Sequence, residues 1–145
     1  MQSEPLKLGF IGGGLNSAVG TTHRIAAEMD KRWKVVAGCF STHEEINRAT
    51  AELWGIEEKR RYDNWKELLA SEKEKRDAIA ILTPTPSHAD IVIETLNQGY
   101  DVICEKALAV SSSEACSIKQ ASEKTSPYWQ LPIIIPGIPC SVNSN

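Results

Sequence analysis

Two patterns of apolar and polar positions alternate along the first 125 residues. Short, nearly continuous apolar runs are typical of strands buried on both faces, and they occur at about 7–11, 33–40, 78–82 and 100–104. Segments with apolar side chains at helical spacing lie between and after these runs, at about 18–30, 42–54, 64–69, 87–98 and 111–124. This alternation predicts an α/β fold, a doubly wound parallel sheet with right-handed crossovers.

Two details of the pattern bear on how the elements pack. Arg61 and Tyr62 are candidates for a short additional strand between the second and third helices. The helix at 18–30 has Ile25, Ala26 and Met29 on one face, which we expect to be its apolar face.

The first predicted strand ends in consecutive glycines. Gly12, Gly13 and Gly14 are followed by polar residues, by Gly20 and then by a helical run. Glycine lets a backbone turn tightly and approach a pyrophosphate, and the N-terminus of the next helix attracts negative charge. The spacing differs from G-x-G-x-x-G, because five residues separate Gly14 from Gly20. The turn therefore indicates either a dinucleotide site or an ordinary glycine-rich connection.

Three more unusual segments follow predicted strands, at residues 40–42, 83–88 and 105–106. The carboxyl ends of parallel strands share one edge of a sheet, and ligands of doubly wound sheets bind outside that edge. The convergence of these segments on the glycine turn favours a nucleotide site. A doubly wound domain that binds no nucleotide is the alternative.

Composition narrows the choice of partners. The net charge is −3, and no stretch concentrates lysine and arginine beyond KRW at 31–33 and EKRRY at 58–62, so nucleic acid is not an expected partner. No apolar run has membrane length, and the N-terminus lacks the parts of a signal peptide, so we expect a cytoplasmic protein without a membrane partner. The four cysteines are scattered without metal-ligand spacing, and no metal site is expected.

Three motifs resemble the Gfo/Idh/MocA family of NAD(P)-dependent oxidoreductases. His23 follows the glycine turn, TPTPSH at 83–88 resembles the family's T-P-x-x-x-H, and CEKALA at 104–109 resembles its E-K-P. The resemblance covers roughly residues 6–125. It implies a Rossmann-like domain, which in the family precedes a larger α/β domain that makes most substrate contacts. It also implies hydride transfer between a nicotinamide cofactor and a carbinol of a sugar or polyol.

The resemblance further implies roles for individual residues. Lys106 would be the catalytic residue that binds the substrate oxygen or helps to move its proton. The glycine turn would hold the pyrophosphate, and the segments after the later strands would lie along the nicotinamide half. The expected cofactor-binding residues are Gly12, Gly13, Gly14, Asn16, Ser17, Ser41, Thr42, Thr83, Pro84, His88, Glu105 and Lys106. Alternatively, His23 and His88 belong only to helix starts, and Glu105 and Lys106 form an exposed turn.

Two positions depart from the family pattern. Ala107 stands where the family has proline, and a cis bond before alanine costs ~3–4 kcal/mol, so we expect a trans bond there. Phe40 occupies the place of the acidic residue that binds the ribose 2′-hydroxyl and selects NAD. Ser41 and Thr42 follow it, so the cofactor is NAD or NADP with a slight preference for NADP.

The pattern ends after Thr125. Four prolines, Pro127, Pro132, Pro136 and Pro139, exclude a regular central strand. Regrouping degenerate codons of residues 129–140 by one base permits the string LAVTYNYTGYPM, which is a good apolar strand followed by a turn. We therefore interpret residues 126–145 as the out-of-frame end of a longer gene. The alternative is a genuine short family member with a loose proline-rich tail.

Residues 1–125 are accordingly predicted to form an NAD(P)-binding Rossmann-like domain that is incomplete at its C-terminal end. The parent protein would be an oxidoreductase acting on a small polyol or sugar. This chain alone is expected to be inactive, because the substrate domain is absent. The alternative is a non-catalytic module that binds the nucleotide.

Overall fold

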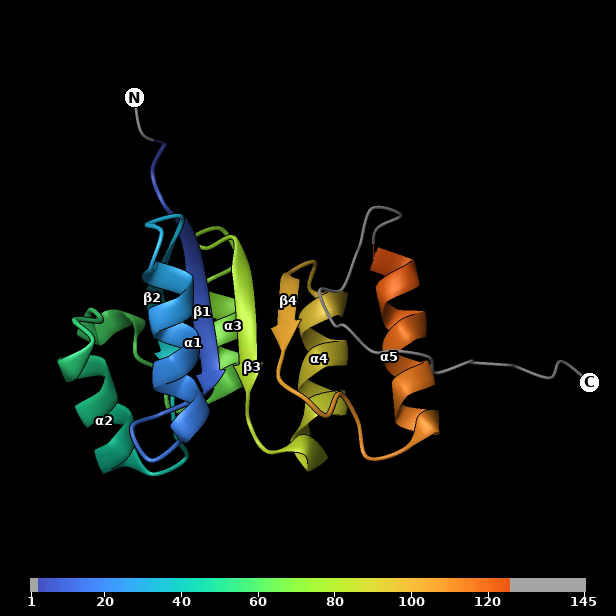
Figure 1. Cartoon of the computed structure of the whole chain (residues 1–145). Helices are drawn as coiled ribbons and strands as arrows, with labels where there is room; N and C mark the ends of the chain where they lie inside the picture. Colours follow the sequence, from blue (N-terminus) through green and yellow to red (C-terminus); the bar gives the residue numbers. More distant parts are fainter. Residues whose placement is uncertain (1–2, 126–145) are drawn as a thin grey trace, which may run out of the picture.

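The computed structural model describes residues 3–125 (Figure 1). Four strands and five α-helices alternate, with two short 3₁₀ helices, η1 and η2, in the connections. In chain order the elements are β1 (Leu6–Gly12), α1 (Ala18–Glu28), β2 (Trp33–Cys39), α2 (Glu44–Leu53), η1 (Glu58–Arg60), α3 (Trp65–Ser71), β3 (Ala78–Leu82), η2 (Thr85–Ser87), α4 (His88–Asn97), β4 (Asp101–Cys104) and α5 (Ser112–Thr125).

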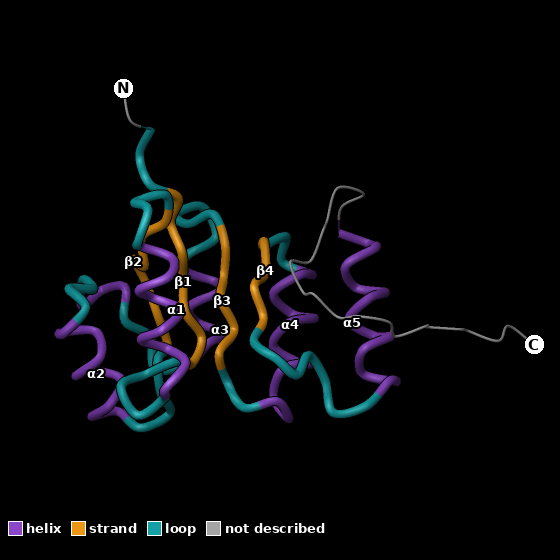
Figure 2. Tube along the Cα trace, in the orientation of Figure 1, coloured by secondary structure: helices purple, strands orange, loops and turns teal. Residues whose placement is uncertain are grey.

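The strands form one parallel sheet in the order β2-β1-β3-β4 (Figure 2). Ile11 of β1 pairs with Cys39 of β2 and with Ile81 of β3, and Ile81 pairs in turn with Cys104 of β4. All four strands therefore end at one level, and the loops that follow them share a single edge. The predicted doubly wound α/β sheet is confirmed.

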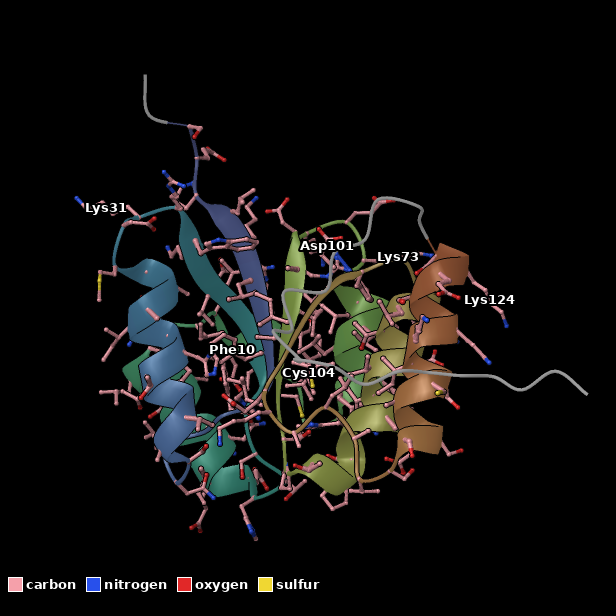
Figure 3. All side chains as sticks on the ribbon, turned by 45° about the vertical axis from the view of Figure 1, so that its right-hand side comes forward. Phe10, Lys31, Lys73, Asp101, Cys104 and Lys124 are labelled. Carbon is pink, nitrogen blue, oxygen red and sulfur yellow. The ribbon has the colours of Figure 1, made fainter. Side chains whose placement is uncertain are left out.

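Helices cover both faces of the sheet, as the alternation of side chains along the strands requires. In β3, Ile79 and Ile81 belong to the buried cluster with residues of α3, α4 and α5, whereas Ala78, Ala80 and Leu82 belong to the cluster beside α1 and α2. Every residue of β3 is buried. Figure 3 shows labelled Phe10 near the middle of the molecule, while Lys31 and Lys124 extend from its outside.

Helix α1 packs on the sheet through a different face from the one expected. Ile25 and Met29 are 57% and 76% exposed, whereas Gly20 is buried and Ala27 is half-buried. The reason is steric, because a glycine allows the helix backbone to approach the turn after β1 more closely than a larger side chain would. Apolar spacing alone predicted the wrong contact face.

The short strand considered at Arg61 and Tyr62 is reduced to one bridge between Arg61 and Gly38. The backbone carbonyl of Tyr62 instead accepts a hydrogen bond from the side-chain amide of Asn47. A ladder cannot extend through a carbonyl that a neighbouring helix already binds, so pairing stops after a single residue pair.

Residues 126–145, which carry the expected out-of-frame tail and the expected incompleteness of the sheet, lie outside the described residues. Within residues 3–125, no helix combines the length and the apolar character that crossing a bilayer requires.

Candidate cofactor site

A pocket of about 490 Å³ lies at the carboxyl edge of the sheet. That volume is in the range of small-molecule sites. It brings together the segments after β1, β2, β3 and β4, and the expected site residues on its wall are Gly12, Gly13, Gly14, Asn16, Ser17, Ser41, Thr42, Thr83, Pro84 and Glu105. His88 and Lys106 were expected there and do not line it.

The glycine turn has the shape that a close backbone approach requires. Gly12 and Gly13 have φ angles of +82° and +75°, which side chains rarely allow. A Cβ atom on Gly20 would lie 1.8 Å from the carbonyl oxygen of Gly13, so α1 and the turn are in direct backbone contact. Gly20 therefore performs the close-packing role of the last glycine in G-x-G-x-x-G, although the loop before it is longer.

The N-terminus of α1 opens onto the same pocket. Ser17 is its N-cap residue and lines the pocket, and its side chain makes no capping hydrogen bond. No acidic residue lies in the first turn of α1. The loop before the helix is held in place, because the Leu15 N–H donates to Thr50 Oγ1 of α2 at 3.1 Å. Helix N–H groups without a side-chain cap, and the absence of an acidic side chain in the first turn of α1, suit the binding of a pyrophosphate. The residues present therefore fit a dinucleotide.

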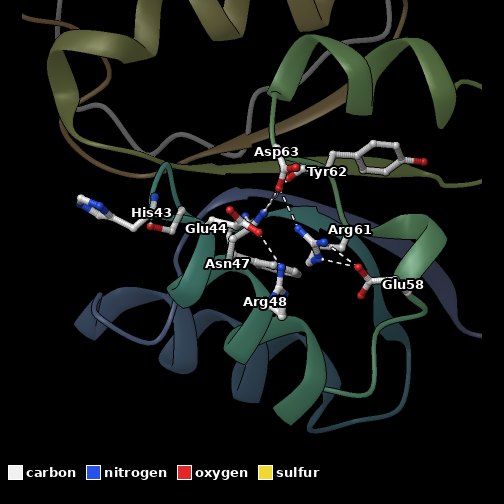
Figure 4. A network of polar contacts seen from close by, with 10 residues as sticks. His43, Glu44, Asn47, Arg48, Glu58, Arg61, Tyr62 and Asp63 are labelled. Atoms are coloured by element: carbon white, nitrogen blue, oxygen red, sulfur yellow. Dashed lines mark hydrogen bonds and ion pairs between the residues drawn. The ribbon is translucent and has the colours of Figure 1, made fainter.

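A buried asparagine holds the wall formed by the end of β2. Asn47 of α2 accepts a hydrogen bond from the Phe40 N–H at 2.8 Å, and its amide donates to the Tyr62 carbonyl and to Asp63 Oδ1 (Figure 4). The Phe40 carbonyl in turn accepts from the Gly14 N–H at 2.9 Å. The backbone at Phe40 is thus fixed on both sides, and no carboxylate belongs to the part of the pocket wall at residues 40–43.

Glu105, at the end of β4, is fixed by two donors. His23 Nε2 of α1 lies 2.5 Å from Glu105 Oε2, and the Lys106 N–H donates to Oε1 at 2.9 Å. The hydrogen bond from His23, followed by that from the Lys106 backbone, holds the pKa of the Glu105 carboxyl below its ordinary value. A carboxylate therefore stands on the part of the pocket wall that follows β4.

His23→Ala is expected to raise the pKa of Glu105 toward its ordinary value, because the first of the two donors is lost. Carbon-detected NMR titration of the Glu105 carboxyl measures this, with Thr22→Ala on the adjacent exposed position as the control. The native pKa is depressed, so the contribution of Glu105 to stability is present above the ordinary carboxyl pKa and disappears as the pH falls through the native value. An unchanged titration in the His23 variant would contradict the assigned contact.

The Lys106–Ala107 peptide bond is cis, so the expectation of a trans bond was wrong. Contacts from outside the dipeptide fix the backbone on both sides of this bond, from Glu105 Oε1 to the Lys106 N–H and from the His88 ring to the Ala107 carbonyl. The expectation of a trans bond considered only the intrinsic cost of a cis bond before alanine, and that cost does not include these two contacts. The Lys106 side chain is exposed at the end of β4, next to Glu105.

His88 is not among the residues that line the pocket, where it was expected. Its ring is fully buried, and both ring nitrogens contact backbone carbonyl oxygens, of Thr83 at 2.6 Å and of Ala107 at 2.7 Å. In this structure His88 joins the segment after β3 to the segment after β4.

Sequence reasoning missed two residues of the pocket region and named a third, His23, only as part of a motif. His43 lines the wall after β2, His23 holds Glu105, and Asn47 holds Phe40. Of the two missed residues, Asn47 carried a usable signal, because a polar side chain on the apolar face of a helix needs buried hydrogen-bond partners.

Comparison with known proteins agrees with this geometry. The sequence profile described as "Oxidoreductase family, NAD-binding Rossmann fold" (Gfo/Idh/MocA) matches residues 6–130. The uncharacterized oxidoreductase YfiI of Bacillus subtilis is 36% identical over 126 residues, which are 84% of this chain and 32% of YfiI.

Solved structures are similar as well. An inositol dehydrogenase homolog from Azotobacter vinelandii complexed with NAD+ has a TM-score of 0.80 and 28% identity, over 85% of this chain and 32% of that chain. The same homolog complexed with NADH and myo-inositol gives a TM-score of 0.80 and 28% identity, over 85% and 33%. This chain thus spans about a third of the length of these relatives. The chain belongs to the Gfo/Idh/MocA oxidoreductase family and corresponds to the family's NAD-binding Rossmann domain.

Proposed function

We propose that this domain binds a nicotinamide dinucleotide at the carboxyl edge of the sheet and serves hydride transfer at a carbinol carbon of a sugar or polyol. The observation that carries the proposal is the convergence of the glycine turn, the segment after β2 and the segments after β3 and β4 on one pocket. The glycine turn and the N-terminus of α1 would hold the pyrophosphate. Thr83, Pro84 and Glu105 would flank the nicotinamide end.

Lys106 is proposed to act on the substrate hydroxyl. Oxidation of a carbinol moves the C–H hydrogen as hydride to the nicotinamide ring and releases the hydroxyl proton, leaving a carbonyl group. A lysine beside the reacting carbon can hold the hydroxyl oxygen and accept that proton. Lys106 adjoins Glu105, which lines the pocket, and its exposed side chain can reach a substrate outside the sheet edge. The A. vinelandii homolog with myo-inositol supports a polyol as the substrate class.

We further propose that the pocket accepts NADP(H) as well as NAD(H). The wall after β2 presents Ser41, Thr42 and His43 and no carboxylate that would repel a 2′-phosphate. Glu44, the next residue, is exposed and engaged by Arg48 at 2.5 Å. Both features reduce the electrostatic repulsion that a 2′-phosphate would meet at the ribose end of the pocket.

Titration of the purified chain with NADH and with NADPH, followed by nicotinamide fluorescence, tests binding of each cofactor. Lys106→Ala is expected to leave both dissociation constants within about twofold, because Lys106 does not line the cofactor pocket. Absence of binding of either cofactor at millimolar concentration would refute the function. A large loss of affinity in the variant would contradict the role assigned to Lys106.

A panel of polyols that includes myo-inositol then separates catalysis from binding. Reduction of NAD+ or NADP+ by one of them in the wild-type chain, lost in the Lys106 variant, supports the enzyme. Binding without any reduction supports the non-catalytic module.

A further inference from the structure

His88 begins α4 and lies between the two turns that flank the nicotinamide end of the pocket. The first turn follows β3 and comprises residues 83–87, and the second follows β4 and comprises residues 105–107. His88 has no exposed surface. Its ring is therefore closed to water, and its polar atoms depend on partners within the protein.

Each ring nitrogen of His88 meets an oxygen that can only accept a hydrogen bond. Nε2 lies 2.6 Å from the Thr83 carbonyl of the first turn, and Nδ1 lies 2.7 Å from the Ala107 carbonyl of the second. A histidine ring donates from both nitrogens when it is protonated, whereas an amide side chain of similar size has its two donors on one nitrogen. The ring is thus suited to span two separated carbonyl groups.

Other contacts hold each turn separately. Ser87 Oγ lies 2.8 Å from Thr83 Oγ1 and 2.8 Å from the Pro84 carbonyl oxygen, and these hydrogen bonds stay inside the first turn. The Glu105 N–H donates to the Ile81 carbonyl, which ties the start of the second turn to β3. Among residues 3–125, hydrogen bonds from one side chain to both turns come from His88 alone.

We propose that His88 is a positioning residue that locks the two turns together and so fixes the nicotinamide end of the pocket. The role in cofactor binding rests on the proposed function, whereas the joining of the turns does not. Loss of the ring frees the second turn at Ala107, from which Lys106 and Glu105 project. The ring's hydrogen bonds go to neither the glycine turn nor the wall after β2, and both are expected to keep their geometry.

The joining of the turns is tested without ligand by amide hydrogen exchange read by NMR. His88→Gln is expected to speed exchange at residues 105–107 about tenfold or more, since the ring's hydrogen bond to the second turn is lost. Exchange at residues 12–14 is expected to stay unchanged. Ser87→Ala is the matched control, because it loses bonds only within the first turn and leaves residues 105–107 protected.

Wild-type protein provides a second measurement that needs no variant. Two slowly exchanging ring N–H signals of His88 are expected, that of Nε2 with cross-peaks to Thr83 and that of Nδ1 with cross-peaks to Ala107. Absence of such a signal, or unchanged exchange at residues 105–107 in a folded His88→Gln chain, would overturn the joining role.

Two ligands test the positioning role. His88→Gln is expected to weaken NADH about tenfold and to leave ADP-ribose, which lacks nicotinamide, within about twofold. Equal losses for both ligands, or no loss for either, would overturn the positioning role while leaving the proposed function intact. Failure of the wild-type chain to bind either ligand would overturn both the proposed function and the positioning role, and the exchange experiment would still report on the joining of the turns.

Discussion

Glu72→Ala is expected to lower the free energy of unfolding by about 3 kcal/mol, a large part of the stability of a small domain. The Glu72 side chain is fully buried beyond the end of α3, where Arg60 Nη2 donates to it at 2.5 Å and the Tyr62 hydroxyl at 2.7 Å. Burial raises the pKa of this carboxyl, and the hydrogen bonds from Arg60 and Tyr62 outweigh that effect and lower it. Removal of the carboxylate leaves a mostly buried guanidinium and a hydroxyl without their partner.

Urea unfolding followed by far-UV circular dichroism measures the effect. Glu74→Ala, an exposed position in the same connection, is the matched control and is expected to change stability by no more than about 0.5 kcal/mol. A loss below about 1 kcal/mol in the Glu72 variant would show that Arg60 and Tyr62 find other partners, contrary to the contribution assigned to this network.

The network also supports the pocket from a distance. Tyr62 binds Glu72 through its hydroxyl and Asn47 through its backbone carbonyl, and Asn47 fixes the Phe40 N–H. The wall after β2 is therefore connected to the buried Glu72 carboxylate through Asn47 and Tyr62. Because of this connection, we expect Glu72→Ala to weaken NADH binding as well. Glu74→Ala should leave NADH binding unchanged.

The strands and the location of the site were accessible from the sequence for a physical reason. A parallel strand buried on both faces must be a short apolar run, and β3 at Ala78–Leu82 meets that condition at every residue. Parallel strands then bring their following loops to one edge, which places Thr83 and Glu105 on the same pocket as the glycine turn. Both inferences depend on local pattern and on topology, and neither needs side-chain detail.

Features that depend on contacts between distant segments escaped the same reasoning. The position of His88 at a helix start says nothing of the Ala107 carbonyl, which lies 19 residues later in the chain. The His23 contact with Glu105 spans 82 residues. Likewise, Ile25 and Met29 have the spacing of a buried face, yet the close approach at Gly20 turns that face to solvent.

Gly20→Ala is expected to weaken NADH binding about 100-fold or more, because the added methyl group cannot fit beside the glycine turn. Its Cβ atom would lie 1.8 Å from the oxygen and 2.4 Å from the carbon of the Gly13 carbonyl. Both are backbone atoms, so no flexible side chain can move aside. Either α1 shifts away from the turn or the turn opens, and each movement separates the helix N-terminus from the glycines that would hold the pyrophosphate.

Fluorescence titration with NADH, together with circular dichroism, separates loss of the site from loss of the fold. Thr21→Ala alters the next, exposed residue of α1 and is expected to keep the wild-type affinity within about twofold. Overpacking at Gly20 costs about 1–3 kcal/mol, which a domain of ordinary stability survives. The Gly20 variant should therefore remain folded and lose the cofactor. Wild-type affinity in this variant would mean that the contact between α1 and the turn is not needed for binding, and the proposed pyrophosphate site would be wrong.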